Sequence, residues 1–328
     1  MKLDEIARLA GVSRTTASCV INGKAAQYRI SQRTQDKVMA VVRAHNYQPD
    51  GQAAALRGGL SHTLGLIVPD LANPSYSALA QLLERLARQN GFQVLITSSG
   101  DCPATERELA SMLKARRVDA MMVASCLPVN DHFYIALNQQ LPVVGLDRPL
   151  PHRLASVSSE NAEACERLVR TLLPAKPGHM LMLGAAPALG VSQERERGFV
   201  TAATSAGIPY TVHYAKRFDR QSACTLLESL EDDWQQPKAI VTTAFVLLEG
   251  VMDFFYQKAG ALPPSLKLAT FGDHRLLDFL GAPVNTMAQD HHLVAEKVMS
   301  LTLDAVRGNY RSGHCTVPRL LHQRYRPR

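Results

Sequence analysis

Three short amphipathic segments open the chain, each bounded by residues that start or stop helices. The first apolar stripe ends at Gly11, a residue that commonly terminates helices. Ser13 and Ser31 stand as helix N-caps before the second and third segments. The pattern therefore predicts three helices within residues 1–47, and the Pro and Gly residues that follow predict a break and a linker over residues 48–60.

The pattern changes beyond residue 60, where near-continuous apolar runs alternate with amphipathic segments such as residues 74–90. The runs fall into two sets, at 62–70, 92–99, 118–125 and 141–147, and at 179–185, 210–216, 238–244 and 266–272. Apolar strands that alternate with helices indicate parallel sheets with helices on both faces, so we expect an α/β body of two similar lobes. The predicted lobe boundaries are 61–158 with 290–318 for the N-terminal lobe, and 159–289 with 319–328 for the C-terminal lobe. A ligand would bind between the lobes, at the carboxyl ends of the strands.

Composition narrows the class of protein. The 328 residues are 46% hydrophobic and 20% charged, as in globular proteins, and no run of eighteen apolar residues predicts a membrane span. The N-terminus has acidic residues and no apolar leader, and the six cysteines are scattered without a CxxC spacing. We therefore expect a cytoplasmic protein with free thiols.

No catalytic or cofactor motif appears. The chain has no Walker A sequence, no GxGxxG and no GxSxG, so an enzyme function and a bound cofactor have no support. His274, His291 and His292 invite a metal interpretation, but no carboxylate or cysteine stands at ligand spacing around them, and surface or core histidines are the simpler interpretation.

The net charge of +7 is unevenly distributed. Residues 1–60 hold nine Lys and Arg against four Asp and Glu, and residues 305–328 add six Arg without any acid. A basic head on a slightly acidic body predicts a module that binds a polyanion, although many solvated helices have the same balance.

The second predicted helix has two distinct faces. At about 100° per residue, Ala17, Val20 and Ile21 share the side that would pack on the first helix. The opposite side carries Thr15, Cys19 and Asn22, with Arg14 on the flank and the hydroxyls of Ser13, Thr16 and Ser18 as donors for phosphates. This arrangement predicts the reading helix of a helix-turn-helix, and a plain surface helix with a serine cap is the alternative.

The head sequence resembles the lactose-repressor family of bacterial transcription regulators. The resemblance is carried by AGVS at 10–13, T-x-S-x-V-x-N at 16–22 and NY-x-P at 46–49. The long loop GKAAQYRIS at 23–31 and the body segments GLIVPDLANPSY, VDAMMVASCLP, LDRPL and ATFGDHRLLDFL are similar to the fructose-repressor subfamily, across essentially the whole chain. The resemblance implies a helix-turn-helix head, a two-lobed body like that of periplasmic binding proteins, and double-stranded operator DNA as partner.

The resemblance also implies which residues meet DNA. It extends the contacts predicted on the second helix to Lys24, Tyr28, Arg29, Asn46 and Tyr47. In the family, the segment after NY-x-P becomes a hinge helix on DNA, and Leu56, with Ala53 beside it, occupies the place of a leucine that wedges into the minor groove. The alternative for Leu56 is an anchor between linker and body.

Candidate effector residues lie where predicted strands end. Ser75, Tyr76, Arg195, Asp273 and Gln289 match or approach family positions that contact a sugar. Asp147 and Arg148 close the run 141–147, where a local ion pair is the alternative role. Because two guanidinium groups can clamp a phosphate, Arg148 and Arg195 favour a phosphorylated sugar, and the resemblance makes fructose 1-phosphate the first effector to test.

Three classes of function remain to be compared. A regulator released from its operator by a phosphorylated sugar is the main hypothesis, with a sucrose-type repressor of the same family as the alternative. A periplasmic sugar-binding protein would share the body but would have a signal peptide and no basic head. We expect a homodimer, with a tetramer left open. For Cys19, the hypothesis is an altered operator preference with redox sensitivity, and the alternative is contact with a thymine methyl group or no contact.

Overall fold

The computed structural model describes residues 1–47, 59–230 and 238–324, and the chain divides into two compact units, Met1–Ser61 and His62–Arg328. Residues 48–58, with the expected hinge helix and its Ala53 and Leu56, lie outside the described part.

The first unit is a three-helix head. Its helices are α1 (Leu3–Ala10), α2 (Arg14–Ile21) and α3 (Gln32–Ala44). The predicted signals act as expected: Gly11 ends α1 with φ 64°, and the Ser13 hydroxyl accepts a hydrogen bond from the Thr16 backbone N–H at 3.1 Å. A small core that includes Ile6, Ala17 and Val38 holds the three helices together.

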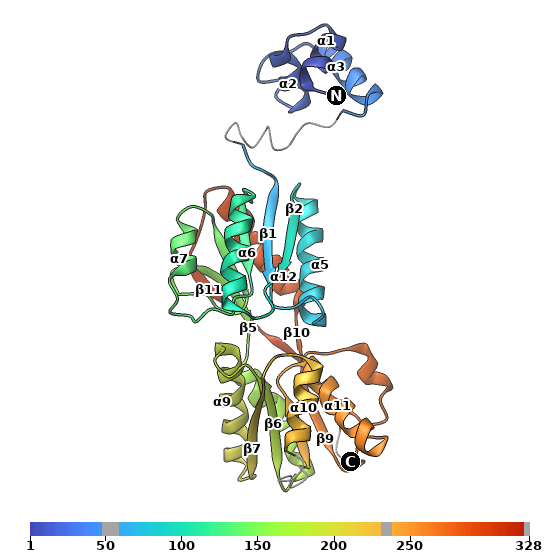
Figure 1. Cartoon of the computed structure of the whole chain (residues 1–328), viewed down its shortest axis with the longest axis vertical. Coiled ribbons are helices and arrows are strands. Elements are labelled where there is room, and N and C mark those ends of the chain that lie inside the picture. Colours follow the sequence, from blue (N-terminus) through green and yellow to red (C-terminus); the bar gives the residue numbers. More distant parts are fainter. Residues whose placement is uncertain (48–58, 231–237, 325–328) are drawn as a thin grey trace. The chain divides into compact units, whose positions relative to one another are not determined.

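The second unit contains two six-stranded sheets with helices on both faces, which confirms the predicted α/β body (Figure 1). Both sheets have the same doubly wound core order, in which the first strand of the lobe lies between its second and third strands. In the first sheet, all pairings are parallel and the order is β11–β5–β4–β3–β1–β2. In the second, the order is β12–β10–β9–β8–β6–β7, and only β12 runs antiparallel to its neighbour.

The strands of the N-terminal lobe are β1 (Thr63–Val68), β2 (Gln93–Ser98), β3 (Ala120–Val123), β4 (Val143–Asp147), β5 (Ala155–Ser159) and β11 (Gly313–Val317). Its helices are α5 (Pro74–Gln89), α6 (Pro103–Ala115), α7 (Phe133–Asn138) and α12 (His291–Val306). The strands of the C-terminal lobe are β6 (Met180–Ala185), β7 (Tyr210–Ala215), β8 (Ala239–Thr242), β9 (Lys267–Phe271), β10 (Val284–Gln289) and β12 (Arg319–His322). Its helices are α8 (Ala162–Arg170), α9 (Gly190–Ser205), α10 (Arg220–Ser229) and α11 (Phe245–Ala259), with 3₁₀ turns η1 (Leu173–Ala175) and η3 (Arg275–Phe279).

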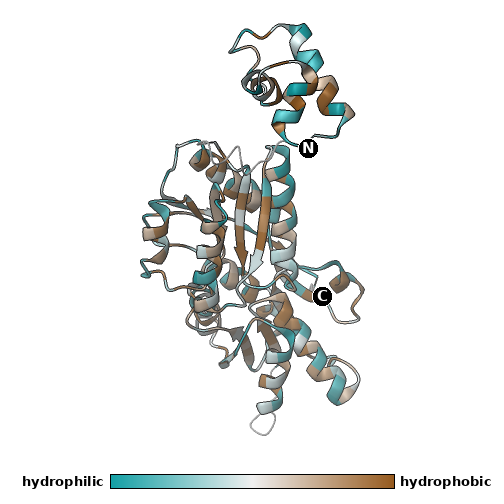
Figure 2. Cartoon of the chain, turned by 45° about the horizontal axis from the view of Figure 1, so that its top comes forward, coloured by the Kyte–Doolittle hydropathy of each residue, from teal (hydrophilic) through white to brown (hydrophobic). Residues whose placement is uncertain are grey.

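Each sheet buries alternate side chains on opposite faces. On β1, Leu64 and Leu66 pack toward α5 and α12, whereas Ile67 packs toward α6 and α7. The hydrophobic residues in Figure 2 accordingly concentrate on the central strands, while the helices alternate between hydrophobic and hydrophilic sides. No helix among the described residues is both long and apolar enough to cross a bilayer.

Strand β2 departs from the expected burial. The apolar run 92–99 predicts a strand covered on both faces, but β2 lies at the edge of its sheet and exposes Leu95 and Ile96. An edge strand has only one neighbour, so the apolar side chains of the run do not all reach a core.

The chain passes between the two lobes three times, directly after β5, β10 and β11. The predicted boundary after residue 158 falls inside β5, because Ser159 still pairs with Val317 of β11. These crossings bring Asn161, Gln289 and Arg319 to the middle of the second unit, where the two sets of strand ends face each other.

Candidate functional site

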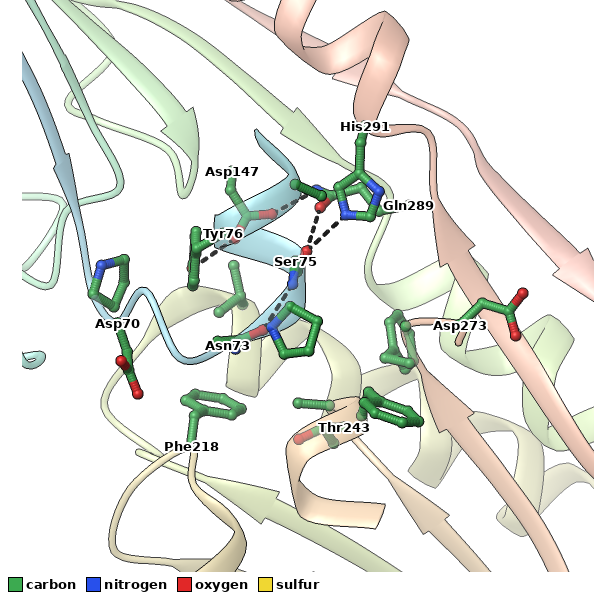
Figure 3. A pocket seen from close by; sticks show the side chains of 18 of the residues that line it. Asp70, Asn73, Ser75, Tyr76, Asp147, Phe218, Thr243, Asp273, Gln289 and His291 are labelled. Atoms are coloured by element: carbon green, nitrogen blue, oxygen red, sulfur yellow. Dashed lines mark hydrogen bonds between the residues drawn. The ribbon is translucent and has the colours of Figure 1, made fainter. Parts of the chain in front are cut away.

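A cavity of about 420 Å³ lies between the lobes, at the carboxyl ends of the strands (Figure 3). All seven effector residues expected from the sequence are among its lining residues: Ser75, Tyr76, Asp147, Arg148, Arg195, Asp273 and Gln289. Its position agrees with the rule that doubly wound sheets bind ligands beyond the strand ends, where the strand order reverses. The volume suits a small molecule such as a sugar.

A chain of hydrogen bonds crosses the cavity wall from one lobe to the other. Gln289, at the end of β10, donates from Nε2 to Asp147 Oδ1 at 2.7 Å and to Ser159 Oγ at 3.0 Å. Its Oε1 accepts from the Ser75 hydroxyl at 3.0 Å, and Ser75 Oγ lies 2.9 Å from His291 Nε2. Since the single hydroxyl proton of Ser75 is given to Gln289, the Nε2 atom of His291 must carry a proton and donate. The direction of every hydrogen bond in this network is thereby fixed.

Asp147 is the negative centre of the network. Its backbone has φ 62°, an uncommon value for a residue other than glycine, and its Oδ2 accepts from the Tyr76 hydroxyl at 2.9 Å. Burial alone would raise the pKa of Asp147, but the positive charges of Arg319, Arg195 and Arg148 outweigh it and hold the pKa below its ordinary value. The carboxylate is therefore charged inside the cavity wall.

Arg148 is buried, and its partner is distant in sequence. It makes two hydrogen bonds to Asp101, from Nη1 at 2.5 Å and from Nη2 at 3.2 Å. The alternative of a direct ion pair between Asp147 and Arg148 is therefore wrong: the two adjacent side chains bind different partners. Asp101 follows β2 and Arg148 follows β4, and β3 and β1 lie between these two strands in the sheet.

Two further buried arginines lie against one aromatic ring. The guanidinium carbon of Arg195 is 4.6 Å from the ring centre of Phe271, and that of Arg319 is 5.2 Å from it. Arg195 is oriented by the Asn161 side chain at 2.8 Å and the Thr243 carbonyl at 2.7 Å, whereas Arg319 donates from Nε to the Glu160 carbonyl at 2.8 Å.

Neither Arg195 nor Arg319 forms a salt bridge to a carboxylate of the described residues. Burial, reinforced by the charge of Arg195, lowers the pKa of Arg319 to about 9. Burial likewise lowers the pKa of Arg195. A low pKa in a buried arginine shows that its charge lacks compensation. The pair is therefore suited to an anion.

The cavity also contains a polar group without a partner. The hydroxyl oxygen of Thr243 is buried and has no hydrogen-bond partner among the described residues, although most buried hydroxyls in proteins have one. A ligand hydroxyl or phosphate oxygen would satisfy it. Thr243 is labelled on the wall opposite Ser75 and Tyr76 in Figure 3.

Asp273 lines the cavity, but its carboxylate is engaged elsewhere. It is bonded by Thr286 at 2.9 Å, His322 at 2.8 Å and Arg324 at 2.9 Å. Figure 3 shows the carboxylate turned away from the other labelled polar side chains. The resemblance implies that Asp273 binds sugar hydroxyls. In this structure its carboxylate is already engaged by other side chains and is not available for them.

Sequence patterns missed several cavity residues: Asp101, Thr243, His291 and Arg319. In the sequence, Arg319 appeared only as one of the six arginines that make residues 305–328 basic, and His291 was considered only as a metal ligand. In the described residues, no group of three or more His, Cys, Asp or Glu side chains could hold a metal ion. A signal for Asp101 and Thr243 exists, since each lies at the end of an apolar run: Asp101 two residues after the run 92–99, and Thr243 as the last but one residue of the run 238–244.

The head exposes the expected DNA-binding side chains to different degrees. Arg14, Thr15, Lys24, Tyr28 and Arg29 are exposed, and Arg14 also pairs with Asp4 at 3.1 Å on the surface. Cys19 is half-buried, and all six cysteines of the chain are free thiols.

Other polar residues of the head serve the helix ends as well. The hydroxyls of Ser13 and Thr16 lie 2.8 Å apart, and the Asn22 amide donates to the Ser18 carbonyl at 2.8 Å. Asn46 is exposed with φ 46°, whereas Tyr47 packs partly buried against the head core.

Residues 2–50 match the LacI family of bacterial regulatory proteins, and residues 61–247 match periplasmic binding proteins and the sugar-binding domain of the LacI family. The chain is 45% identical to the fructose operon regulatory protein of Vibrio cholerae, over 99% of this chain and 100% of that protein. The chain belongs to the LacI family of bacterial regulatory proteins.

Further comparisons narrow the position within the LacI family. The catabolite repressor/activator of Escherichia coli is 48% identical over 92% of this chain and 91% of its own length. A crystal structure of the Pseudomonas putida Cra dual regulator with fructose 1-phosphate is 41% identical, with a TM-score of 0.77 over 81% of this chain and 99% of that one. A sucrose operon repressor of Klebsiella pneumoniae is more distant, at 34% identity over 93% of this chain and 92% of that protein.

These relatives are transcription regulators and not enzymes. The LacI-family chain is accordingly a DNA-binding regulator that responds to a sugar, and the fructose-type hypothesis is favoured over the sucrose-type alternative.

Proposed function

We propose that this LacI-family regulator binds fructose 1-phosphate in the cavity between its lobes and then leaves its operator. The observation that carries the proposal is the pair of buried arginines, Arg195 and Arg319, which form no salt bridge to a carboxylate of the described residues and lie beside a cavity of sugar size. The complex of the Pseudomonas putida relative with fructose 1-phosphate supports the same ligand.

The phosphate would lie against Arg195 and Arg319, because guanidinium groups bind phosphate oxygens through paired charge-assisted hydrogen bonds. Arg319 has both terminal amino groups available for this, since only its Nε has a side-chain hydrogen bond within the described residues. Arg148 is neutralised by Asp101, so it would line the other wall and would not clamp the phosphate together with Arg195.

The sugar hydroxyls would meet the hydrogen-bond network and the unpartnered hydroxyl of Thr243. Asp147 and Gln289 offer acceptors, while Ser75 and Tyr76 exchange their present partners for ligand oxygens. These groups come from both lobes, so a bound ligand stabilises one particular arrangement of the lobes.

On the DNA side, we infer that α2 enters the major groove. The exposed Thr15 and the half-buried Cys19 would contact base edges, with the exposed Arg14 on the flank. Asn22 lies on the same side of the helix as Thr15 and Cys19, and the hydroxyls of Ser13, Thr16 and Ser18 would donate to phosphates. The further DNA contacts would come from Lys24, Tyr28, Arg29, Asn46 and Tyr47. The regulator would act in the cytoplasm as a homodimer on a near-palindromic operator, with Leu56 and Ala53 of the undescribed hinge at the minor groove. Because the two binding events are coupled, operator DNA must weaken effector binding as much as the effector weakens DNA binding.

The test is a mobility-shift titration on an operator selected from random DNA by the chain itself. Fructose 1-phosphate, fructose 6-phosphate, fructose and sucrose are added in turn. We expect release by fructose 1-phosphate at the lowest concentration. The variant Arg195→Ala should bind the operator yet ignore the effector, whereas Arg88→Met, at an exposed position of α5, should respond normally. Release by sucrose alone would refute the proposed effector, and loss of operator binding in Arg195→Ala would refute the role of Arg195.

A further inference from the structure

The carboxylate of Asp273 is held outside the cavity by groups from the C-terminal end of the chain. Its Oδ1 accepts from Arg324 Nη1 and from the Thr286 hydroxyl, both at 2.9 Å, and its Oδ2 lies 2.8 Å from His322 Nδ1. Thr286 is on β10, His322 ends β12, and Arg324 follows β12 by two residues. Together with Asp278, these residues form what we call the C-terminal clasp: Asp273, Asp278, Thr286, His322 and Arg324.

Arg324 is the central residue of the clasp. Its side chain is only 17% exposed, and it also donates from Nε to Asp278 at 2.7 Å and from Nη1 to the Thr286 hydroxyl at 3.1 Å. Burial alone would raise the pKa of Asp273, but its hydrogen bonds to Arg324, His322 and Thr286 outweigh burial and lower that pKa. The clasp is thus a satisfied set of charges and hydrogen bonds with no need of a ligand.

The position of Asp273 makes the clasp relevant to the cavity. The residue lines the cavity wall next to Phe271, the ring against which Arg195 and Arg319 lie. Only two side-chain torsions separate its backbone from its carboxylate, so a different rotamer would point the charge toward the arginines. Asp147 already offsets part of their charge, and a second carboxylate there would cancel the excess that an anion requires.

We propose that Arg324 is a positioning residue that selects anionic ligands by keeping the carboxylate of Asp273 out of the effector site. The proposal rests on the proposed function, because it concerns the same cavity and the phosphate group of its ligand. Specificity for a phosphate then depends on keeping the Asp273 carboxylate, which would repel it, out of the cavity, as well as on the arginines that attract it.

The test compares four variants of the full chain by calorimetric titration: Asp273→Asn, Arg324→Ala, the double variant of both, and Asp278→Asn. The ligands are fructose 1-phosphate, inorganic phosphate and neutral fructose. In Arg324→Ala, the Asp273 carboxylate loses its charged partner and keeps only its contacts with Thr286 and His322. We expect it to turn toward the cavity and to weaken binding of both phosphates by roughly tenfold, without weakening binding of fructose. In the double variant the charge is gone, so phosphate affinity should return to within about twofold of the starting chain.

The single variants separate positioning from general damage. Asp273→Asn should bind fructose 1-phosphate within about twofold of the starting chain, because its carboxylate does not reach the ligand. Asp278→Asn removes the other ion-pair partner of Arg324 and keeps the Asp273 contact, so it should behave in the same way. Melting temperatures of all four variants show whether they remain folded.

Three results would overturn the clasp: unchanged phosphate binding in Arg324→Ala, no recovery in the double variant, or loss of phosphate binding in Asp273→Asn alone. Failure of the proposed function is distinguishable from these. If the starting chain binds inorganic phosphate but not fructose 1-phosphate, the effector is wrong while the variants still test the clasp with inorganic phosphate. If it binds neither phosphate, both proposals fall.

Discussion

Replacing Arg319 with methionine should stabilise the ligand-free protein while removing its response to the effector. Arg319 is only 7% exposed, and burial together with the charge of Arg195 lowers its pKa from its ordinary value to about 9. That reduction corresponds to on the order of 5 kcal/mol of unfavourable free energy for keeping the charge in the folded state at neutral pH. Since the unfolded chain holds this proton more tightly, the cost applies below about pH 9 and fades above it.

Methionine keeps an unbranched apolar side chain beside Phe271 and removes the charge. The substitution loses the hydrogen bond from Nε to the Glu160 carbonyl and the contact with the ring, which together offset part of the gain. We expect a net stabilisation of about 2 kcal/mol, or a rise in melting temperature of about 5 °C. Loss of the charge-assisted hydrogen bonds to the phosphate should weaken fructose 1-phosphate binding by about 3 kcal/mol, roughly 150-fold.

The assay is thermal unfolding of the variant with and without fructose 1-phosphate, joined with calorimetric titration. Arg307→Met is the matched control, because Arg307 is exposed at the end of α12 and outside the cavity lining. Its melting temperature and ligand response should equal those of the starting chain. A variant Arg319→Met that melts at a lower temperature and still binds fructose 1-phosphate normally would refute the reasoning that Arg319 is an uncompensated charge awaiting an anion.

Three further predictions follow from other parts of the chain. Gly198→Ala places a methyl group against the Ala162 carbonyl where α8 and α9 cross, so the melting temperature should fall by roughly 6–12 °C, whereas Gly190→Ala, with open space around it, should have little effect. Burial lowers the pKa of His291 below 6.5, so the unfolded chain binds this proton more tightly and the free energy of unfolding should fall as the pH drops through and below 6.5. His291→Gln should remove this part of the pH dependence, and an unchanged dependence of the melting temperature on pH would contradict the prediction. Cys19→Tyr should change the operator sequence selected from random DNA if the half-buried thiol lies at base edges, and an identical selected sequence would show that it does not.

The sequence by itself determined the local elements of this protein. Helix starts and stops follow from capping chemistry within a few residues, as at Gly11 and Ser13, and these need no knowledge of the rest of the fold. The apolar runs likewise determined the central strands, because a strand buried on both faces must be apolar along its length. The pattern also placed Asp147 at the end of a predicted strand, where a ligand of a doubly wound sheet binds. Arg195 lies within α9 and not at a strand end, so only the resemblance to a family position pointed to it.

The tertiary structure alone decided the strands that the pattern missed. β5, with the sequence ASVSS, is buried yet rich in serine, and its hydroxyls are satisfied by groups far away in sequence, such as His314 and Gln289. A polar strand of this kind has no apolar signature of its own. Its place in the sheet is set by its neighbours.

The partners and directions of the charged side chains were also decided only by tertiary structure. Arg148 binds Asp101 and not its neighbour Asp147, Asp273 is drawn out by Arg324, and Arg319 is buried although the sequence shows only a basic C-terminal segment. The physical reason is that a charge interacts with whatever packing brings within a few ångströms, and that proximity comes from chain crossings separated by tens to hundreds of residues. Local sequence determines where the helices and strands form; the folded lobes determine which charges remain uncompensated, and therefore what the cavity can bind.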